Sequence, residues 1–176
     1  TTASADAPLK GLSVLLNAIA SLRSNYPEIR LTLVGRLKPG GDTAQLIASL
    51  GLGDVVDSCK GISHEKMVQK YASASVAVVP SIYEGFGLPA VEAMACGVPL
   101  VSTDGGALAE VVKDAGLVVP AGDSQALAAA IRRLFEDDQL RADYASRGLS
   151  RVQQHFCWNR CAERMEAYYR ERIAAC

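Results

Sequence analysis

The chain has 176 residues, of which 49% are hydrophobic and 21% charged, a composition typical of an ordered globular protein rather than a disordered one. Its formal net charge of -1 provides no field that would gather nucleic acid or an anionic membrane, so local groups must hold any anionic ligand. No apolar run approaches the roughly 20 residues that a membrane-spanning helix needs, and the first residues lack the charged-then-apolar order of a secretory signal. We therefore expect one well-buried domain with no nucleic-acid partner and no membrane span.

The first half of the chain alternates between helical and strand patterns. The expected elements are, in chain order, a helix at 11–24, a strand at 30–35, a helix at 44–51, a weaker strand at 54–61 and a helix at 64–74. Asp42 or Thr43 is expected to cap the second of these helices, and Ser63 the third, because short oxygen-bearing side chains satisfy the first amides of a helix.

The second half continues the alternation. It predicts a strand at 75–81, a helix at 88–97, a strand at 99–103, a loop and helix at 105–114, a strand at 116–120, a helix at 123–138, and two helical stretches at 139–156 and 158–175 broken near Phe156. Residues 75–81 are apolar at successive positions, as expected when both faces of a strand are covered. Pro89 just inside one helix and Gly97 beyond its end mark its limits, and Asp123 or Ser124 should cap the helix at 123–138.

Strands that alternate with helices in this way predict an α/β fold: a Rossmann-like parallel sheet with helices on both faces, built from right-handed βαβ units. The start of the chain departs from the series, because residues 1–11 contain no convincing strand although a helix follows at once. Either a short strand lies within residues 1–5, or the chain was cut from something longer. We favour the second interpretation.

The chain contains five cysteines, Cys59, Cys96, Cys157, Cys161 and Cys176. Their odd number in a chain of this size favours reduced thiols and a cytoplasmic location over a disulfide framework. Cys157 and Cys161 have helical spacing and His155 precedes them, but a metal site would need a second group of ligands, which the sequence lacks. We expect the cysteines to be packing residues and the protein to bind no metal.

A glycine-rich turn between two glutamates, Glu84 and Glu92, is the main candidate for a functional site. It follows a strand of the expected parallel sheet, where ligands bind. Gly85 and Gly87 allow close approach of the backbone, and free amides with the start of the next helix would form an anion site suited to a diphosphate. Glu84 would repel phosphate, but it can accept hydrogen bonds from sugar hydroxyls or stabilise a developing positive charge. Glu92 is placed to bind vicinal hydroxyls such as those of a ribose, unless either glutamate is simply a solvated surface residue.

A competing motif must be considered at the same place. Residues 85–90 match the G-x-G-x-x-A pattern of dinucleotide-binding proteins, and Asp104 follows about 20 residues later at the end of the next strand. Against this motif, four residues separate the strand from the first glycine, prolines flank the turn, and Glu84 would crowd a pyrophosphate. A dinucleotide-dependent oxidoreductase domain therefore remains as a less favoured alternative.

The segment 81–112, SIYEGFGLPAVEAMACGVPLVSTDGGALAEVV, resembles the E-x7-E signature region of retaining glycosyltransferases with the GT-B fold, family 4 (glycosyl transferases group 1). The resemblance covers nearly the whole chain. It extends, in order, to residues 10–19, which resemble the family's lysine-glycine helix, and to 31–35, 60–81, 116–137 and 155–169.

The resemblance implies a fold and an activity. Family members have two Rossmann-like domains, and residues 1–176 are similar to the C-terminal, donor-binding one, so the N-terminal acceptor domain would be absent from this chain. The complete enzyme would move a hexose from a nucleoside diphosphate sugar to an acceptor hydroxyl with retention of configuration, without a metal or another cofactor. We expect the isolated domain to be inactive, since acceptor contacts belong to the other half.

The resemblance also implies roles for particular residues. Glu84 would lie beside the transferred sugar and Lys10 would bind the diphosphate, which makes these two the candidate catalytic residues. The other donor-binding candidates are Gly61 and Ile62 near the nucleobase, Gly85, Phe86, Gly87 and Leu88 at the sugar and phosphates, and Glu92 at the ribose.

One departure from the family pattern concerns the Gly-Arg pair that usually precedes the lysine, because Ser4 and Ala5 stand at those positions. Arg36 and Lys38, which follow the next strand, are the candidates for partial compensation of the missing arginine. The departure keeps a second hypothesis open, a non-catalytic module or degenerate transferase that binds a nucleotide or a partner protein without turnover.

Overall fold

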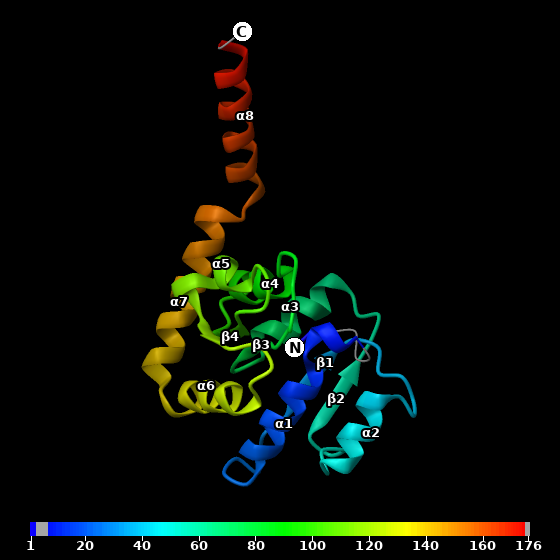
Figure 1. Cartoon of the computed structure of the whole chain (residues 1–176). Coiled ribbons are helices and arrows are strands. Elements are labelled where there is room, and N and C mark those ends of the chain that lie inside the picture. Colours follow the sequence, from blue (N-terminus) through cyan, green and yellow to red (C-terminus); the bar gives the residue numbers. More distant parts are fainter. Residues whose placement is uncertain (3–6, 175–176) are drawn as a thin grey trace.

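The computed structural model describes residues 1–2 and 7–174 (Figure 1). The strands are β1 (Leu31–Val34), β2 (Val56–Cys59), β3 (Ala77–Val79), β4 (Leu100–Thr103) and β5 (Leu117–Val119). The helices are α1 (Leu12–Arg23), α2 (Asp42–Ser49), α3 (His64–Ala72), α4 (Leu88–Ala95), α5 (Leu108–Val112), α6 (Ser124–Glu136), α7 (Asp138–His155) and α8 (Trp158–Ala174), with single 3₁₀ turns at η1 (Pro8–Lys10) and η2 (Lys113–Ala115). The predicted alternation of strands and helices is confirmed.

All strand pairs among the described residues are parallel, as predicted, and these residues pair in two sets. One sheet has the order β1-β2 and the other the order β3-β4-β5. The edge of β1 that faces β3 is partnered by the N-terminal residues, because Thr2 forms a parallel bridge with Val34. A cavity of about 320 Å³ lies between the two sheets and is lined by residues of both, including Leu31 and Val78.

The bridge at Thr2 bears on the expectation of a hidden strand before α1. The carbonyl of Thr1 accepts a hydrogen bond of 2.9 Å from the amide of Val34, so extended backbone does precede the first helix. Residues 3–6 lie outside the described part of the chain, and with them the expectations for Ser4 and Ala5.

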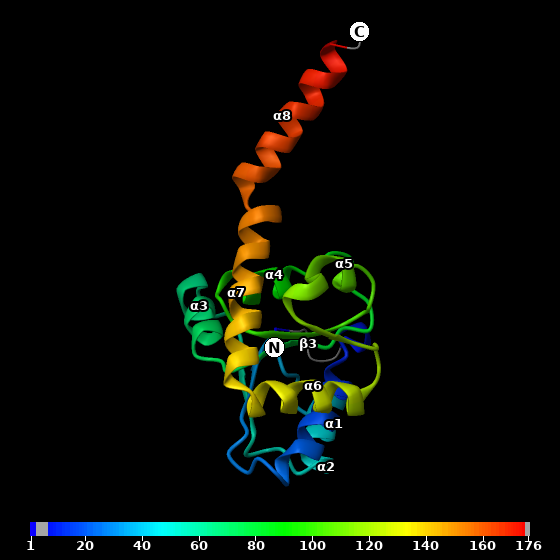
Figure 2. The ribbon, with the colours of Figure 1, turned by 90° about the vertical axis from the view of Figure 1, so that its left-hand side faces the viewer.

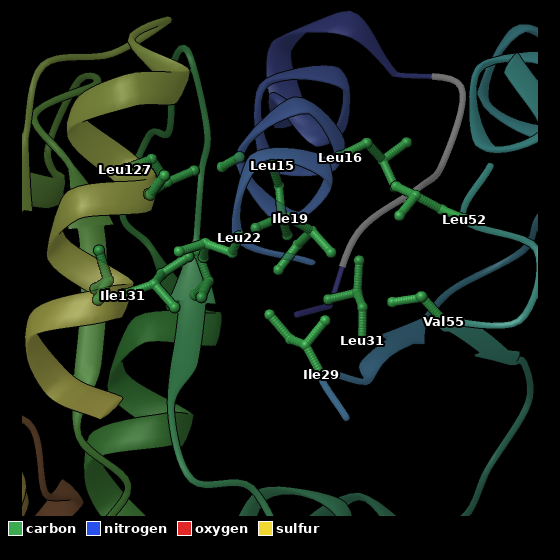
Figure 3. Packing of buried hydrophobic residues seen from close by; sticks show 14 of the residues in the cluster. Leu15, Leu16, Ile19, Leu22, Ile29, Leu31, Leu52, Val55, Leu127 and Ile131 are labelled. Carbon is green, nitrogen blue, oxygen red and sulfur yellow. The ribbon is translucent and has the colours of Figure 1, made fainter. Parts of the chain in front are cut away.

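Helices cover both faces of the strands, as predicted. In β3 successive side chains point to opposite faces, so Val78 packs with α1 and α6 whereas Ala77 and Val79 pack with α4 and α5. On the first face, leucines and Ile19 of α1 pack against Leu127 and Ile131 of α6 (Figure 3). This double coverage explains why residues 77–79 are all buried and read as one apolar run.

The helix caps follow the predicted chemistry in two of three cases. Ser63 accepts a hydrogen bond from the amide of Lys66, and Asp123 accepts bonds from Gln125 and Ala126. The prediction for α2 was wrong, because this helix begins at Asp42 and its N-cap is Gly41, which has no side chain to offer.

The chain ends in two helices that break at Phe156, as predicted. α7 packs along the domain, whereas α8 projects away from it with all of its described residues exposed (Figures 1 and 2). None of the helices in the described residues combines the length and apolar character needed to cross a bilayer.

Candidate functional site

The candidate site lies where β3 ends and its chain turns toward α4. In a parallel arrangement the carboxyl ends of neighbouring strands meet at one edge, which is where ligands bind in α/β folds. Pro80 and Ser81 lead from β3 into the glycine-rich loop, which we define as residues 82–87. The loop places Glu84 close to η1, a segment far away in the sequence.

Lys10 and Glu84, the two candidate catalytic residues, are in direct contact. Lys10 Nζ lies 2.7 Å from Glu84 Oε2, and the two side chains are 33% and 15% exposed. Ser81 Oγ donates a second hydrogen bond to the same oxygen at 3.2 Å. Glu84 Oε1 accepts no hydrogen bond from any described residue. The carboxylate is therefore held through Oε2, and Oε1 has no hydrogen-bond donor among the described residues.

Backbone contacts hold these two residues together. The amides of Ile82 and Tyr83 both donate to the carbonyl of Leu9, at 2.8 and 3.3 Å. Gly11, at the junction of η1 and α1, has a φ of 64°, and a Cβ at this position would lie 1.8 Å from the carbonyl oxygen of Pro80. Only glycine permits this approach, so Lys10 owes its position to the residue that follows it.

The backbone amides at the end of the loop and at the first residue of α4 lack hydrogen-bond partners among the described residues. Within the described residues, the N–H groups of Gly85, Phe86, Gly87 and Leu88 donate no hydrogen bond. Gly87 is the N-cap of α4 and has a φ of 96°. Free amides at the start of a helix attract anions, because the N–H groups and the helix dipole both point positive charge toward the ligand. These unpaired donors lie where the sequence predicts an anion site, and the site itself stays a prediction.

The residues that lead into α5 pack against the backbone of the loop. The amide of Ala107 donates to the carbonyl of Glu84 at 2.9 Å. A Cβ on Gly105 or Gly106 would lie 2.5 Å from Ser81 O or 2.4 Å from Glu84 O, respectively. Our sequence reasoning missed these glycines and Ser81, although a polar residue and a glycine pair directly after buried strands were visible signals.

Glu92 lies on α4 and contacts α3. The buried hydroxyl of Tyr71 lies 3.2 Å from Glu92 Oε2 and 3.4 Å from the carbonyl oxygen of Pro89. Burial, followed by the neighbouring Glu92 carboxylate, raises the pKa of Tyr71 above its ordinary value, so the phenol stays protonated and remains a donor. Tyr71 was not anticipated from the sequence, which gave no indication of which helix would face Glu92.

The remaining predicted residues lie at the carboxyl ends of the other sheet. Gly61 has a φ of 61° and Ile62 is half-buried, both between β2 and the Ser63 cap. Neither makes a hydrogen bond to the glycine-rich loop among the contacts of the described residues. Arg36 and Lys38 follow β1, and neither forms an ion pair within the described part of the chain.

Asp104 and the cysteines are the residues considered for dinucleotide binding and for metal binding, respectively. Asp104, which would hold a ribose in the dinucleotide motif, accepts a hydrogen bond from the amide of Ala121 at 2.8 Å. Groups of three or more His, Cys, Asp or Glu arranged to hold a metal do not occur among residues 1–2 and 7–174. Cys59, Cys96, Cys157 and Cys161 are free thiols, and Cys176 lies outside the described residues.

The parallel α/β architecture and its site define a domain of the GT-B glycosyltransferase class. Residues 2–151 match the family model for glycosyl transferases group 1, and the chain belongs to that family. This membership argues against the oxidoreductase alternative.

Relatives and solved structures agree with this assignment. The chain is 45% identical to an MMP alpha-(1->4)-mannosyltransferase of Mycolicibacterium hassiacum, over 99% of this chain and 44% of the relative. Anabaena HepE in complex with UDP-glucose superimposes with a TM-score of 0.81 at 29% identity, over 94% of this chain and 48% of HepE. The C-terminal domain of a glycosyl transferase group 1 protein, LpcC from Francisella tularensis, superimposes with a TM-score of 0.78 at 25% identity, over 89% of this chain and 85% of that domain. The chain thus spans less than half the length of the mannosyltransferase and of HepE.

Proposed function

We propose that this chain is the donor-binding domain of a retaining glycosyltransferase of family 4, which transfers a hexose from a nucleoside diphosphate sugar to an acceptor hydroxyl. The family membership supports sugar transfer. The mannosyltransferase relative and the HepE complexes with UDP and with UDP-glucose support a hexose carried on a nucleoside diphosphate.

The observation that carries this proposal is the contact between Lys10 and Glu84 beside the unpaired loop amides. A lysine ammonium has three N–H donors, and Glu84 uses one of them, so two remain for a diphosphate. The amides of Phe86, Gly87 and Leu88 add fixed donors for the sugar and phosphates. In this proposal these groups neutralise the departing diphosphate by preorganised electrostatics, and no metal is required.

The proposed role of Glu84 follows from its two oxygens. Oε2 is held by Lys10 and Ser81, and Oε1 accepts a hydroxyl of the transferred sugar. The carboxylate charge then stabilises the positive charge that develops on the anomeric carbon. Glu92, held by Tyr71, binds the ribose, and the backbone at Gly61 and Ile62 lies against the base.

The complete enzyme would require a second, acceptor-binding domain that this chain does not contain, so we propose that residues 1–176 alone transfer no sugar. The match to a solved C-terminal domain of similar extent supports this division. A cytoplasmic location remains our expectation from the cysteine content.

Calorimetric titration with UDP, GDP and ADP tests the proposal. One nucleotide should bind preferentially, and Glu92→Ala should weaken its affinity about tenfold through loss of a charged hydrogen bond. Glu171→Ala, a carboxylate removed from exposed α8, is the matched control and should bind as the parent does. Absence of binding by all three nucleotides would contradict donor binding by this chain.

The sequence departure at Ser4 and Ala5 supports one alternative, a degenerate transferase that binds a donor without using it. The full-length protein distinguishes the two hypotheses, because a transferase consumes the nucleotide sugar in the presence of acceptor and a degenerate member leaves it intact.

A further inference from the structure

The break between α7 and α8 lies against the glycine-rich loop. Phe156, the residue at the break, meets Phe86 of the loop edge-to-face, with ring centroids 5.9 Å apart and planes at 83°. Phe86 remains 45% exposed, and its aromatic contact is with the ring of Phe156. The loop residue whose amide faces the candidate anion site is thereby in contact with a helix end 70 positions later in the chain.

Arg151 holds the ring of Phe156 in place. Its guanidinium carbon lies 5.6 Å from the ring centroid. Its Nη2 donates to the carbonyl of Glu110 at 2.7 Å, and its Nε donates to the carbonyl of Val111. These carbonyls belong to the last turn of α5, where backbone acceptors lack partners within the helix. Arg151 therefore joins α5 to the aromatic pair.

The opposite end of α5 contacts the same loop. The amide of Ala107 donates to Glu84 O, and the side chain of Leu108 fills the space where Gly87 has no Cβ. The loop is thus contacted by the N-terminal end of α5 at Glu84 and Gly87 and by Phe156 at the ring of Phe86, and Arg151 contacts both α5 and Phe156.

We propose that Phe156 is a positioning residue that fixes the donor-binding backbone at Phe86 and Gly87, with Arg151 setting the orientation of its ring. This inference rests on the proposed function, since it is the donor that those amides would bind. A purely structural role is the alternative, because Phe156 also packs against the core of α4 and α5. A positioning role predicts that a substitution at Phe156 increases the mobility of the loop even when the stability of the fold is unchanged. A purely structural role predicts no such separate effect on the loop.

The test compares four variants by ¹⁵N relaxation of the loop amides, by thermal unfolding and by nucleotide titration. Phe156→Leu keeps apolar bulk but removes the ring edge, and Phe156→Tyr restores the ring. Arg151→Gln leaves the ring of Phe156 but removes the guanidinium that stacks on it. Arg147→Gln is the control for loss of a guanidinium that stacks on a ring, because Arg147 lies one turn earlier on α7, 5.7 Å from the ring centroid of Tyr144, and forms no hydrogen bond or ion pair with the loop or with α5 within the described residues.

We expect the order parameters of Phe86 and Gly87 to fall from the rigid value of about 0.85 in Phe156→Leu and Arg151→Gln, with parent values in Phe156→Tyr and Arg147→Gln. Nucleotide affinity should fall about two- to tenfold in the first pair, the range for one aromatic contact. Unchanged order parameters in Phe156→Leu would overturn the proposal, as would equal effects of Arg147→Gln. If the loop loosens in the ligand-free chain but the parent binds no nucleotide, the positioning role stands and the proposed function fails.

Discussion

Lys10 and Glu84 are 74 residues apart in the sequence, yet their side chains meet at 2.7 Å. Each is a donor-site candidate, and in this structure the two side chains form an ion pair with each other. In the proposed donor site the two residues would act on a bound diphosphate in opposite directions, because Lys10 would attract the phosphates while Glu84 would repel them and compete for the ammonium group.

This opposition predicts opposite effects of two substitutions. Lys10→Met should weaken binding of the preferred nucleoside diphosphate about tenfold or more, since it removes a charged hydrogen bond to phosphate. Glu84→Gln should tighten the same binding about two- to fivefold, because one repulsive charge near the surface is worth about 1 kcal/mol at most. Isothermal titration of both variants measures this, and weaker binding by Glu84→Gln would contradict the roles assigned here.

In the full-length enzyme, Glu84→Gln should impair catalysis although it does not impair donor binding. Glu84→Gln should lower kcat about 100- to 1000-fold, the range for removal of one electrostatic stabiliser of a transition state, although the donor binds at least as well. A rate assay at saturating donor checks this, and Ser81→Ala provides a milder companion because it removes only one hydrogen bond to Oε2. A Glu84→Gln enzyme with parental kcat would exclude Glu84 from the chemistry.

Gly11→Ala should destabilise the fold by about 3 kcal/mol or more, because the added Cβ combines left-handed strain with a backbone clash at Pro80. Gly51→Ala is the matched control. Gly51 has a φ of 67° and open space around its Cβ position, so it reports the strain alone, about 1 to 2 kcal/mol. Urea unfolding of both variants measures the difference, and equal losses would mean that the junction at Pro80 yields to the added atom.

Tyr71→Phe should weaken nucleotide binding about two- to fivefold by releasing Glu92, at the scale of one hydrogen bond. It should also change the response to alkali. The pKa of Tyr71 is raised in the folded state, so its contribution to stability is complete below the ordinary tyrosine pKa of about 10 and is lost as pH rises through the folded value. Unfolding free energies measured from neutral to strongly alkaline pH should fall more steeply for the parent than for Tyr71→Phe. Parallel curves would show that Tyr71 is not protected from ionisation.

Local sequence patterns were sufficient for the elements and for part of their capping. The run at 75–81 indicated a strand covered on both faces, and the structure places Val78 and Val79 in separate cores. Ser63 and Asp123 cap their helices because the cap chemistry is contained within four residues. The α2 cap was missed by one position, since Gly41 and Asp42 both permit a helix to start.

The residues that contact the site from other helices could not be predicted from local patterns, because these contacts join distant parts of the chain. Glu84 and the glycine turn stood out in the sequence, whereas the partners Tyr71 and Phe156 depend on which helices pack together. The parallel bridge between Thr2 and Val34 also joins distant parts of the chain, and no local pattern specifies it.

The most direct test of the central claim is a titration of the ¹⁵N-labelled chain with UDP, GDP and ADP, followed amide by amide. The account predicts that the preferred nucleotide shifts the signals of Phe86, Gly87 and Leu88 most strongly, and that Lys10→Met reduces these shifts at equal ligand concentration. Shifts concentrated instead around the cavity between the two sheets, at residues such as Leu31 and Val78, or no saturable shift with any nucleotide, would contradict a donor site at the Lys10–Glu84 pair.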